Sequence, residues 1–148
     1  MHAPDEEHCS LIGAWRSEAE AAGHDPDAAE HVSTHLAHVA DTPAETGRLR
    51  ESLTELLARG TGQYVSLKPG RTQRDHGAYV DWMIGRHAVG TAAHVAERLA
   101  ASAEATGVSR QLLLVEGRGD PEAVRDNIAA LGAALNTGGT PAAAAARP

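Results

Sequence analysis

Three histidines lie within eight consecutive residues, at His31, His35 and His38. On a helix these positions are i, i+4 and i+7, which places the three imidazoles on nearly one line. Neutral imidazole binds zinc, nickel and copper, and two histidines at i and i+4 can share one ion. Cys9, the only cysteine, can add a thiolate if the first helix packs alongside. The spacing therefore predicts that any bound metal is a transition metal such as zinc, held by these four residues.

The same histidines also fit a role without chemistry. The chain has neither an HExxH signature nor paired CxxC motifs. A row of histidines at the margin of a helix is more often a polar face in contact with the next helix, and we favour this interpretation. A pH-responsive interface is a third alternative. The order of Cys9 and the histidines distantly resembles the ligand spacing of zinc-binding anti-sigma factors, but that family has cysteines at its last two positions, so we do not assign it.

A second group of polar side chains follows in residues 76–98. His87 and His94 fall on nearly one line of a helix together with Met83. A histidine that faces a pocket can ligate a metal or act as a general base. A core histidine that is hydrogen-bonded to a hydroxyl or carbonyl group is the commoner outcome.

A basic segment, KPGRTQRDHG, spans residues 68–77 of this otherwise acidic chain. Its cations precede a helix that we expect Asp75 to cap, and both helix N–H groups and arginine side chains favour phosphate or carboxylate. Charges on a loop are more often merely solvated, so its role stays open. The candidate catalytic residues are His76, His87 and Asp75. The candidate ligand-binding residues are Lys68, Arg71, Arg74, Tyr79 and His94.

The elements that would position these groups are predicted to be helical. Asp or Thr followed by Pro begins three segments, at residues 25, 42 and 120, and this pairing is typical of helix N-termini. The expected helices cover 6–22, 25–40, 43–60, 78–107 and 121–136. Residues 64–67 and 112–115 can form a short two-stranded β element, although 110–117 fits either a helix or a strand.

These patterns predict a mainly α fold, a single-domain bundle of about five helices with at most that β element. The domain is expected to span residues 1–136. Residues 137–148 are rich in Ala, Pro and Gly and are expected to form a disordered tail.

Composition limits the class of protein. A net charge of −7 argues against general binding of nucleic acid, and no apolar stretch reaches the roughly 20 residues of a membrane helix. The N-terminal residues lack the basic and apolar regions of a signal peptide. We therefore expect a cytoplasmic protein with no nucleic-acid or membrane partner.

The favoured function is a small, non-catalytic regulatory or accessory protein that senses a metal or a small anionic ligand and can form a homodimer. One alternative is a small enzyme with a histidine base and an arginine anion clamp between residues 68–77 and the long helix. Another is a structural subunit that binds a protein partner. The chain has no Gly-x-Ser-x-Gly elbow, dinucleotide-binding fingerprint or EF-hand loop, so the sequence does not decide whether it is an enzyme.

Overall fold

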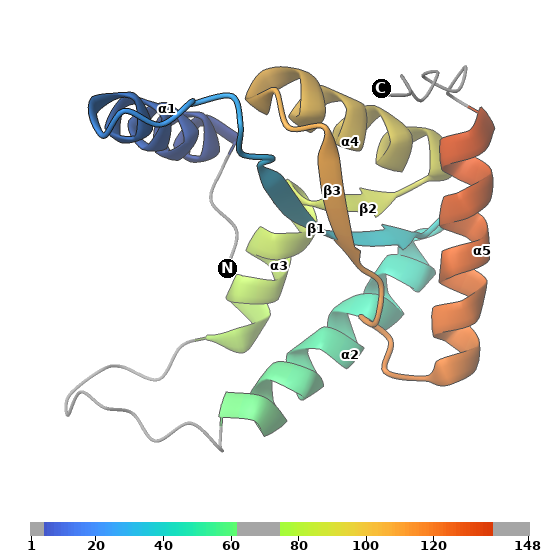
Figure 1. The fold of residues 1–148 in the computed structure, drawn as a ribbon. Coiled ribbons are helices and arrows are strands. Elements are labelled where there is room, and N and C mark those ends of the chain that lie inside the picture. Colours follow the sequence, from blue (N-terminus) through green and yellow to red (C-terminus); the bar gives the residue numbers. More distant parts are fainter. Residues whose placement is uncertain (1–4, 62–74, 138–148) are drawn as a thin grey trace, which may run out of the picture.

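The structure, a computed structural model, describes residues 5–61 and 75–137. Its elements, in chain order, are α1 (Asp5–Ala21), β1 (Val32–Val39), α2 (Pro43–Thr61), α3 (His76–Arg86), β2 (Ala88–Gly90), α4 (Ala92–Thr106), β3 (Arg110–Leu114) and α5 (Pro121–Thr137). The three strands form one parallel sheet in the order β2-β1-β3. The expected helical bundle was therefore wrong, and the described part of the chain is an α/β structure (Figure 1).

The central strand β1 pairs with its two neighbours along different halves of its length. Its first five residues pair with β3, from Val32 opposite Arg110 to Leu36 opposite Leu114. Its last three pair with β2, ending at Val39 opposite Gly90. The ladder between β1 and β3 therefore stops before the carboxyl end of β1.

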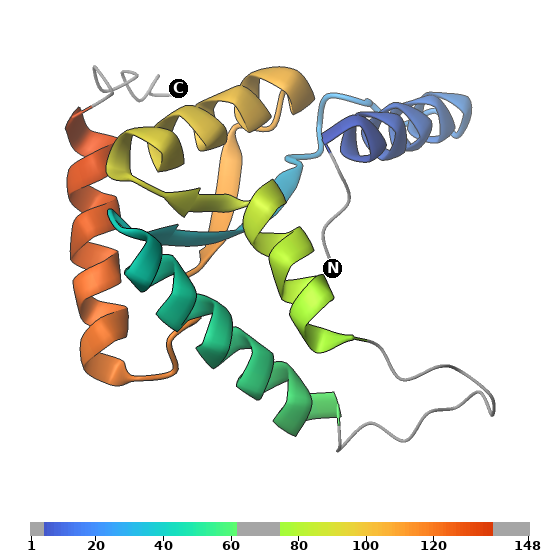
Figure 2. The same ribbon diagram turned by 180° about the vertical axis from the view of Figure 1, so that it is seen from behind.

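Helices cover both faces of the sheet, as Figures 1 and 2 show. One core cluster joins Leu36 and Val89 of the sheet to Leu49 and Leu53 of α2 and Val80 of α3. The cluster on the other face joins Ala37 and Ala88 to Val95 and Leu99 of α4 and Leu131 of α5. Leu36 and Ala37 are adjacent and point to opposite faces, as strand geometry requires. Burial on both sides is typical of strands in parallel sheets.

The segment with the three histidines is not the expected helix: His35 and His38 lie in strand β1, and His31 directly precedes it. Val and Thr within it have branched side chains that favour strands. The Asp25-Pro26 pair begins a turn instead of a helix, in which the amide of Asp27 donates to the Asp25 carboxylate at 2.9 Å. The capping box of α2 is present, since the amide of Glu45 donates to the Thr42 hydroxyl at 3.3 Å and the Glu45 carboxylate accepts from the Thr42 amide at 2.9 Å.

The long helix expected over residues 78–107 is divided in two by β2. Helix α3 ends at Arg86, and Thr91 caps α4 by accepting a hydrogen bond from the His94 amide. Between them Gly90 has a φ of +147°, a conformation that few residues other than glycine adopt. Of the proposed two-stranded element, residues 112–114 lie in β3, which pairs with β1. Residues 64–67 and the tail after residue 137 lie outside the described part of the chain.

Asn127 of α5 joins β1 and β3 where their ladder has stopped. Its amide nitrogen donates to the carbonyl oxygens of Ala37 at 3.0 Å and Val115 at 3.3 Å. Its amide oxygen accepts from the backbone N–H of Val39 at 3.0 Å. Asn127 is only 4% exposed, so one buried side chain replaces the missing strand-to-strand bonds. Among the described helices, none is both long and apolar enough to cross a membrane.

We predict that Asn127→Ala lowers the free energy of unfolding by about 2–3 kcal/mol, because it leaves three backbone groups without their partner. Urea denaturation measures this change. Asn136→Ala is the matched control, since Asn136 lies on the same helix and is exposed; its effect should stay within about 0.5 kcal/mol. Equal losses in both variants would show that the bridge contributes nothing specific.

Candidate functional site

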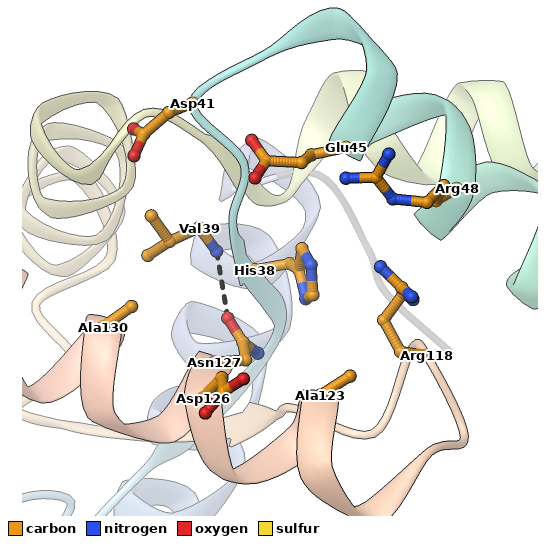
Figure 3. Close-up of a pocket in the computed structure, with 10 residues that line it drawn as sticks. All are labelled: His38, Val39, Asp41, Glu45, Arg48, Arg118, Ala123, Asp126, Asn127 and Ala130. Atoms are coloured by element: carbon orange, nitrogen blue, oxygen red, sulfur yellow. Dashed lines mark hydrogen bonds between the residues drawn. The ribbon is translucent and has the colours of Figure 1, made fainter.

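A cavity of about 270 Å³ lies at the carboxyl end of β1, between α2 and α5. Figure 3 shows the side chains around it. They are His38, Val39, Asp41, Glu45, Arg48, Arg118, Ala123, Asp126, Asn127 and Ala130. In chain order they come from the end of β1 and the turn after it, from α2, from the loop after β3, and from α5.

The position of the cavity follows from the order of the strands. The next strand in the chain, β2, lies beside β1 on one side, and the strand after it, β3, lies beside β1 on the other side. In open parallel sheets, ligands bind outside the carboxyl ends of the strands, at the place where the strand order reverses. The cavity occupies this place between β1 and β3.

His38 is the buried titratable group of the cavity, with only 6% of its surface exposed. In the described part of the chain its Nδ1 atom is buried and has no hydrogen-bond partner. Burial lowers the pKa of His38 below its ordinary value of 6.5, the positive charge of Arg118 lowers it further, and Glu45 partly opposes both. His38 is therefore neutral near pH 7 and has a nitrogen available to a ligand.

Charged side chains surround His38 unevenly. Arg48 and Arg118 lie on one side of it in Figure 3, and the carboxylates of Asp41 and Asp126 lie on the other. Hydrogen bonds from the Thr42 hydroxyl and amide hold the pKa of Glu45 below its usual value, so this carboxylate is ionised. The cavity thus has a positive side that suits an oxyanion, such as the phosphate or carboxylate of a substrate or cofactor.

The four residues of the predicted metal site do not come together. On a strand, side chains three apart point to opposite faces, so His38 faces the cavity while His35 lies near Ser33 and Ser102 on the other side. His31 packs edge-to-face on Trp15, and the Cys9 thiol donates to the carbonyl of Ala105. Within residues 5–61 and 75–137, no three His, Cys, Asp or Glu side chains could hold a metal ion together. The prediction of a metal-binding helical protein was wrong.

His35 belongs instead to a buried polar cluster that attaches α1 to α4. The Ser102 hydroxyl and the Arg98 guanidinium donate to the Asp5 carboxylate at 2.8 and 3.0 Å. Burial raises the pKa of Asp5, but these two hydrogen bonds, together with electrostatic attraction from Arg98 and His35, lower it by more. His87 lies edge-to-face with His35, at 5.9 Å between ring centroids. Ser33, His35, His87 and Ser102 are all buried, and none of them lines the cavity at His38.

The other candidates from the sequence do not line the cavity. Asp75 caps α3 and accepts a hydrogen bond from the Ala78 amide at 3.0 Å. His76 is the first residue of that helix, and Tyr79 stacks on Trp82. His94 is exposed on α4. Lys68, Arg71 and Arg74 lie outside the described residues.

Among the sequence candidates that the structure describes, only His38 lines the cavity. The sequence patterns gave no site role to Glu45, Arg48, Arg118 or Asn127. A recognisable signal existed for Arg118, which stands between two glycines directly after a predicted strand, as loops at ligand sites often do. Asn127 carried no such signal, since one asparagine in a helix usually faces solvent.

A family model described as Luciferase-like monooxygenase matches residues 1–110 of the 148. No curated protein matches the chain. A monooxygenase family points to an enzyme, so the favoured prediction of a non-catalytic accessory protein was wrong. The alternative, an enzyme with a histidine base and an arginine clamp, agrees better with the match.

The matched residues have a simple relation to the fold. They end at Arg110, the first residue of β3, and include the adjacent parallel strands β1 and β2. The family is one of (β/α)8 barrels, in which consecutive strands are neighbours, as β1 and β2 are here. The match covers well over half of the sequence, and the chain belongs to the luciferase-like monooxygenase family.

Proposed function

We propose that the chain is an enzyme whose active site is the cavity at the carboxyl end of β1, with His38 as the residue that accepts a proton from the substrate. The family match supports catalysis, and the position of the cavity agrees with the general location of ligand sites in parallel α/β proteins. This proposal keeps the histidine base and the arginine clamp of the alternative from the sequence. It assigns the first role to His38 and the second to Arg48 and Arg118, instead of to residues 68–87.

The observation that carries the proposal is the state of His38. A general base must be unprotonated at the working pH and must have a free nitrogen within reach of the substrate. Burial and Arg118 keep the pKa of His38 low, and its Nδ1 atom has no partner among the described residues. A buried polar atom without a partner costs about 1–3 kcal/mol, and a bound substrate would remove this cost.

Arg48 and Arg118 supply the second element of the mechanism. When His38 removes a proton, negative charge develops on the substrate. Fixed positive groups nearby stabilise that charge in the transition state without having to reorganise. The apolar side chains of Val39, Ala123 and Ala130 form the remaining part of the wall.

A monooxygenase transfers one oxygen atom of dioxygen to its substrate and reduces the other to water, and this needs two electrons from a cofactor. Flavins are among the cofactors that perform dioxygen chemistry, and a bound reduced flavin would supply those electrons. The two arginines fit the phosphate of such a cofactor as well as an anionic substrate. The cavity, at about 270 Å³, is slightly smaller than most ligand pockets, so it can take only part of a large cofactor.

We also propose a cytoplasmic location, a small anionic molecule as the ligand and a homodimer as the assembly. The net charge of −7 supports the absence of a nucleic-acid partner.

We predict that nuclear magnetic resonance titration finds the pKa of His38 below 6.5 in the folded protein. Unfolded His38 then binds a proton more tightly than folded His38, so this residue makes the free energy of unfolding fall as the pH drops from about 6.5 toward the folded pKa. Above about pH 6.5 both states are neutral and the effect disappears. His38→Gln should remove this part of the pH dependence. A folded pKa at or above 6.5 would contradict the described environment.

We predict that His38→Gln slows oxygen transfer at least about 100-fold, the usual contribution of a general base. The measurement supplies reduced flavin mononucleotide, isotopically labelled dioxygen and a panel of small carboxylic and phosphorylated compounds, and mass spectrometry detects one labelled atom in the product. His24→Gln is the control, because His24 is exposed and lies outside this cavity. Equal rates for the two variants, or no labelled product with the wild type, would contradict the proposed function.

A further inference from the structure

We infer that Arg48 and Arg118 form a binding site for one oxyanion, and that the ligand carries a phosphate or carboxylate group next to the atom from which His38 takes a proton. The inference rests on the proposed function only in treating this cavity as a ligand site. It goes further by assigning the chemical class of the ligand and the residues that select it.

The first observation is that two cations face one small cavity without an internal partner. Neither Arg48 nor Arg118 forms an ion pair within the described residues, whose ion pairs involve other arginines. Figure 3 shows their guanidinium groups on the same side of His38. An anion that binds between the two guanidinium groups would be attracted by both charges.

The nearest carboxylate does not neutralise the pair. Glu45 is held by Thr42, whose hydroxyl and amide donate to the same carboxylate oxygen at 3.0 and 2.9 Å. The charge of Arg48 contributes to the low pKa of Glu45, but these two side chains form no ion pair in the described structure. Glu45 therefore offsets one of the two arginine charges on this side of the cavity, while Asp41 and Asp126 on the other side make the lining as a whole slightly negative.

The second observation is that the backbone fixes the position of Arg118. Gly117 is buried, and a Cβ atom there would lie 2.6 Å from Cδ1 of Leu49, in the core beneath α2. Gly119 has a φ of +66°, a conformation that glycine adopts without strain. The loop therefore sits close against the core, which fixes the backbone of Arg118 beside the cavity.

The third observation is independent of charge and comes from His38. The Nδ1 atom of His38 is buried and has no hydrogen-bond partner among the described residues. The side chain is only 6% exposed and lines the same cavity. A buried polar atom in this state has hydrogen-bonding capacity left for a ligand or a water molecule. The ligand must then reach both the arginines and His38, so its oxyanion lies near an O–H or C–H group that can lose a proton.

The opposite wall restricts the ligand further. Asp41 and Asp126 lie across the cavity from the arginines (Figure 3). Their charges would repel a second anionic group at that end. The site therefore favours a ligand with one anionic end, whose other end is neutral or positively charged.

The test uses inorganic phosphate and acetate as probes, titrated separately into the wild-type protein at pH 7.5 and constant ionic strength. Binding is followed by the imidazole resonances of His38. We expect saturable binding of at least one probe, together with a rise in the pKa of His38, because a bound anion stabilises the imidazolium. Comparison of phosphate with acetate identifies which oxyanion the site prefers. Failure of both probes to bind at 50 mM would overturn the inference.

The decisive variants are Arg118→Gln and Arg125→Gln. We expect Arg118→Gln to weaken the probe about tenfold or more, as the loss of a charge-assisted hydrogen bond does, and to raise the pKa of His38 in the absence of probe. Arg125 is exposed on α5 and does not line the cavity, so its variant should bind within twofold of the wild type. Circular dichroism establishes that both variants are folded, and Arg48→Gln provides a second test should Arg118→Gln fail to fold. Equal binding by the Arg118 and Arg125 variants would overturn the inference.

These outcomes are separable from those of the proposed function. If Arg118→Gln no longer binds the probe but His38→Gln transfers oxygen at the wild-type rate, the oxyanion site is supported and the catalytic role of His38 is contradicted. If His38→Gln is inactive but Arg118→Gln binds the probe normally, the catalytic role is supported and the oxyanion site is contradicted.

Discussion

The side chain of Asn127 determines how β1 and β3 meet, and the site depends on that junction. Two parallel strands that separate must leave backbone groups without ladder partners, and in a buried place each such group is costly. Asn127 satisfies the carbonyls of Ala37 and Val115 and the N–H of Val39. Because a helix side chain makes these bonds, β1 and β3 can diverge at their carboxyl ends and α5 can lie beside the opening. His38 and Arg118, one residue before Val39 and three after Val115, are thereby placed around the same cavity.

Sequence patterns predicted local features of this fold better than its architecture. The capping box of Thr42 and Glu45 was readable because its hydrogen bonds join residues three apart. The strand character of residues 32–39 was not, because their spacing also fits a helical stripe, and the partners that bury Leu36 and Ala37 come from α2 and α4, later in the chain. The three-residue strand β2 was too short to show a period, so it was absorbed into one long predicted helix. Only the tertiary contacts resolve these ambiguities.

The proposed site was not predicted from the sequence. A histidine base beside an arginine clamp was only an alternative, placed at residues 68–77 and the following helix. His38 was named as a metal ligand, because the helical assumption grouped it with His35, which a strand turns to the opposite face. Arg118 lies 80 residues from His38 in the sequence and reaches it because β3 pairs with β1. Strand order brings them together, and strand order is a long-range property that periodicity does not contain.

The family match and the strand order together explain why the site lies where it does. In a closed barrel, the first strand has the second strand on one side and the last strand on the other. Here β2 occupies the first of these positions, and β3, whose first residue Arg110 is the last one matched, occupies the second. Helices α2 and α3 on one face and α4 and α5 on the other make the described sheet an open, doubly wound layer, whereas barrel helices cover the outer face alone. Both architectures nevertheless bind their ligands at the carboxyl ends of parallel strands. The location of the site therefore depends on the direction of β1 and β3 and on the loops that leave them, and it does not require the sheet to close.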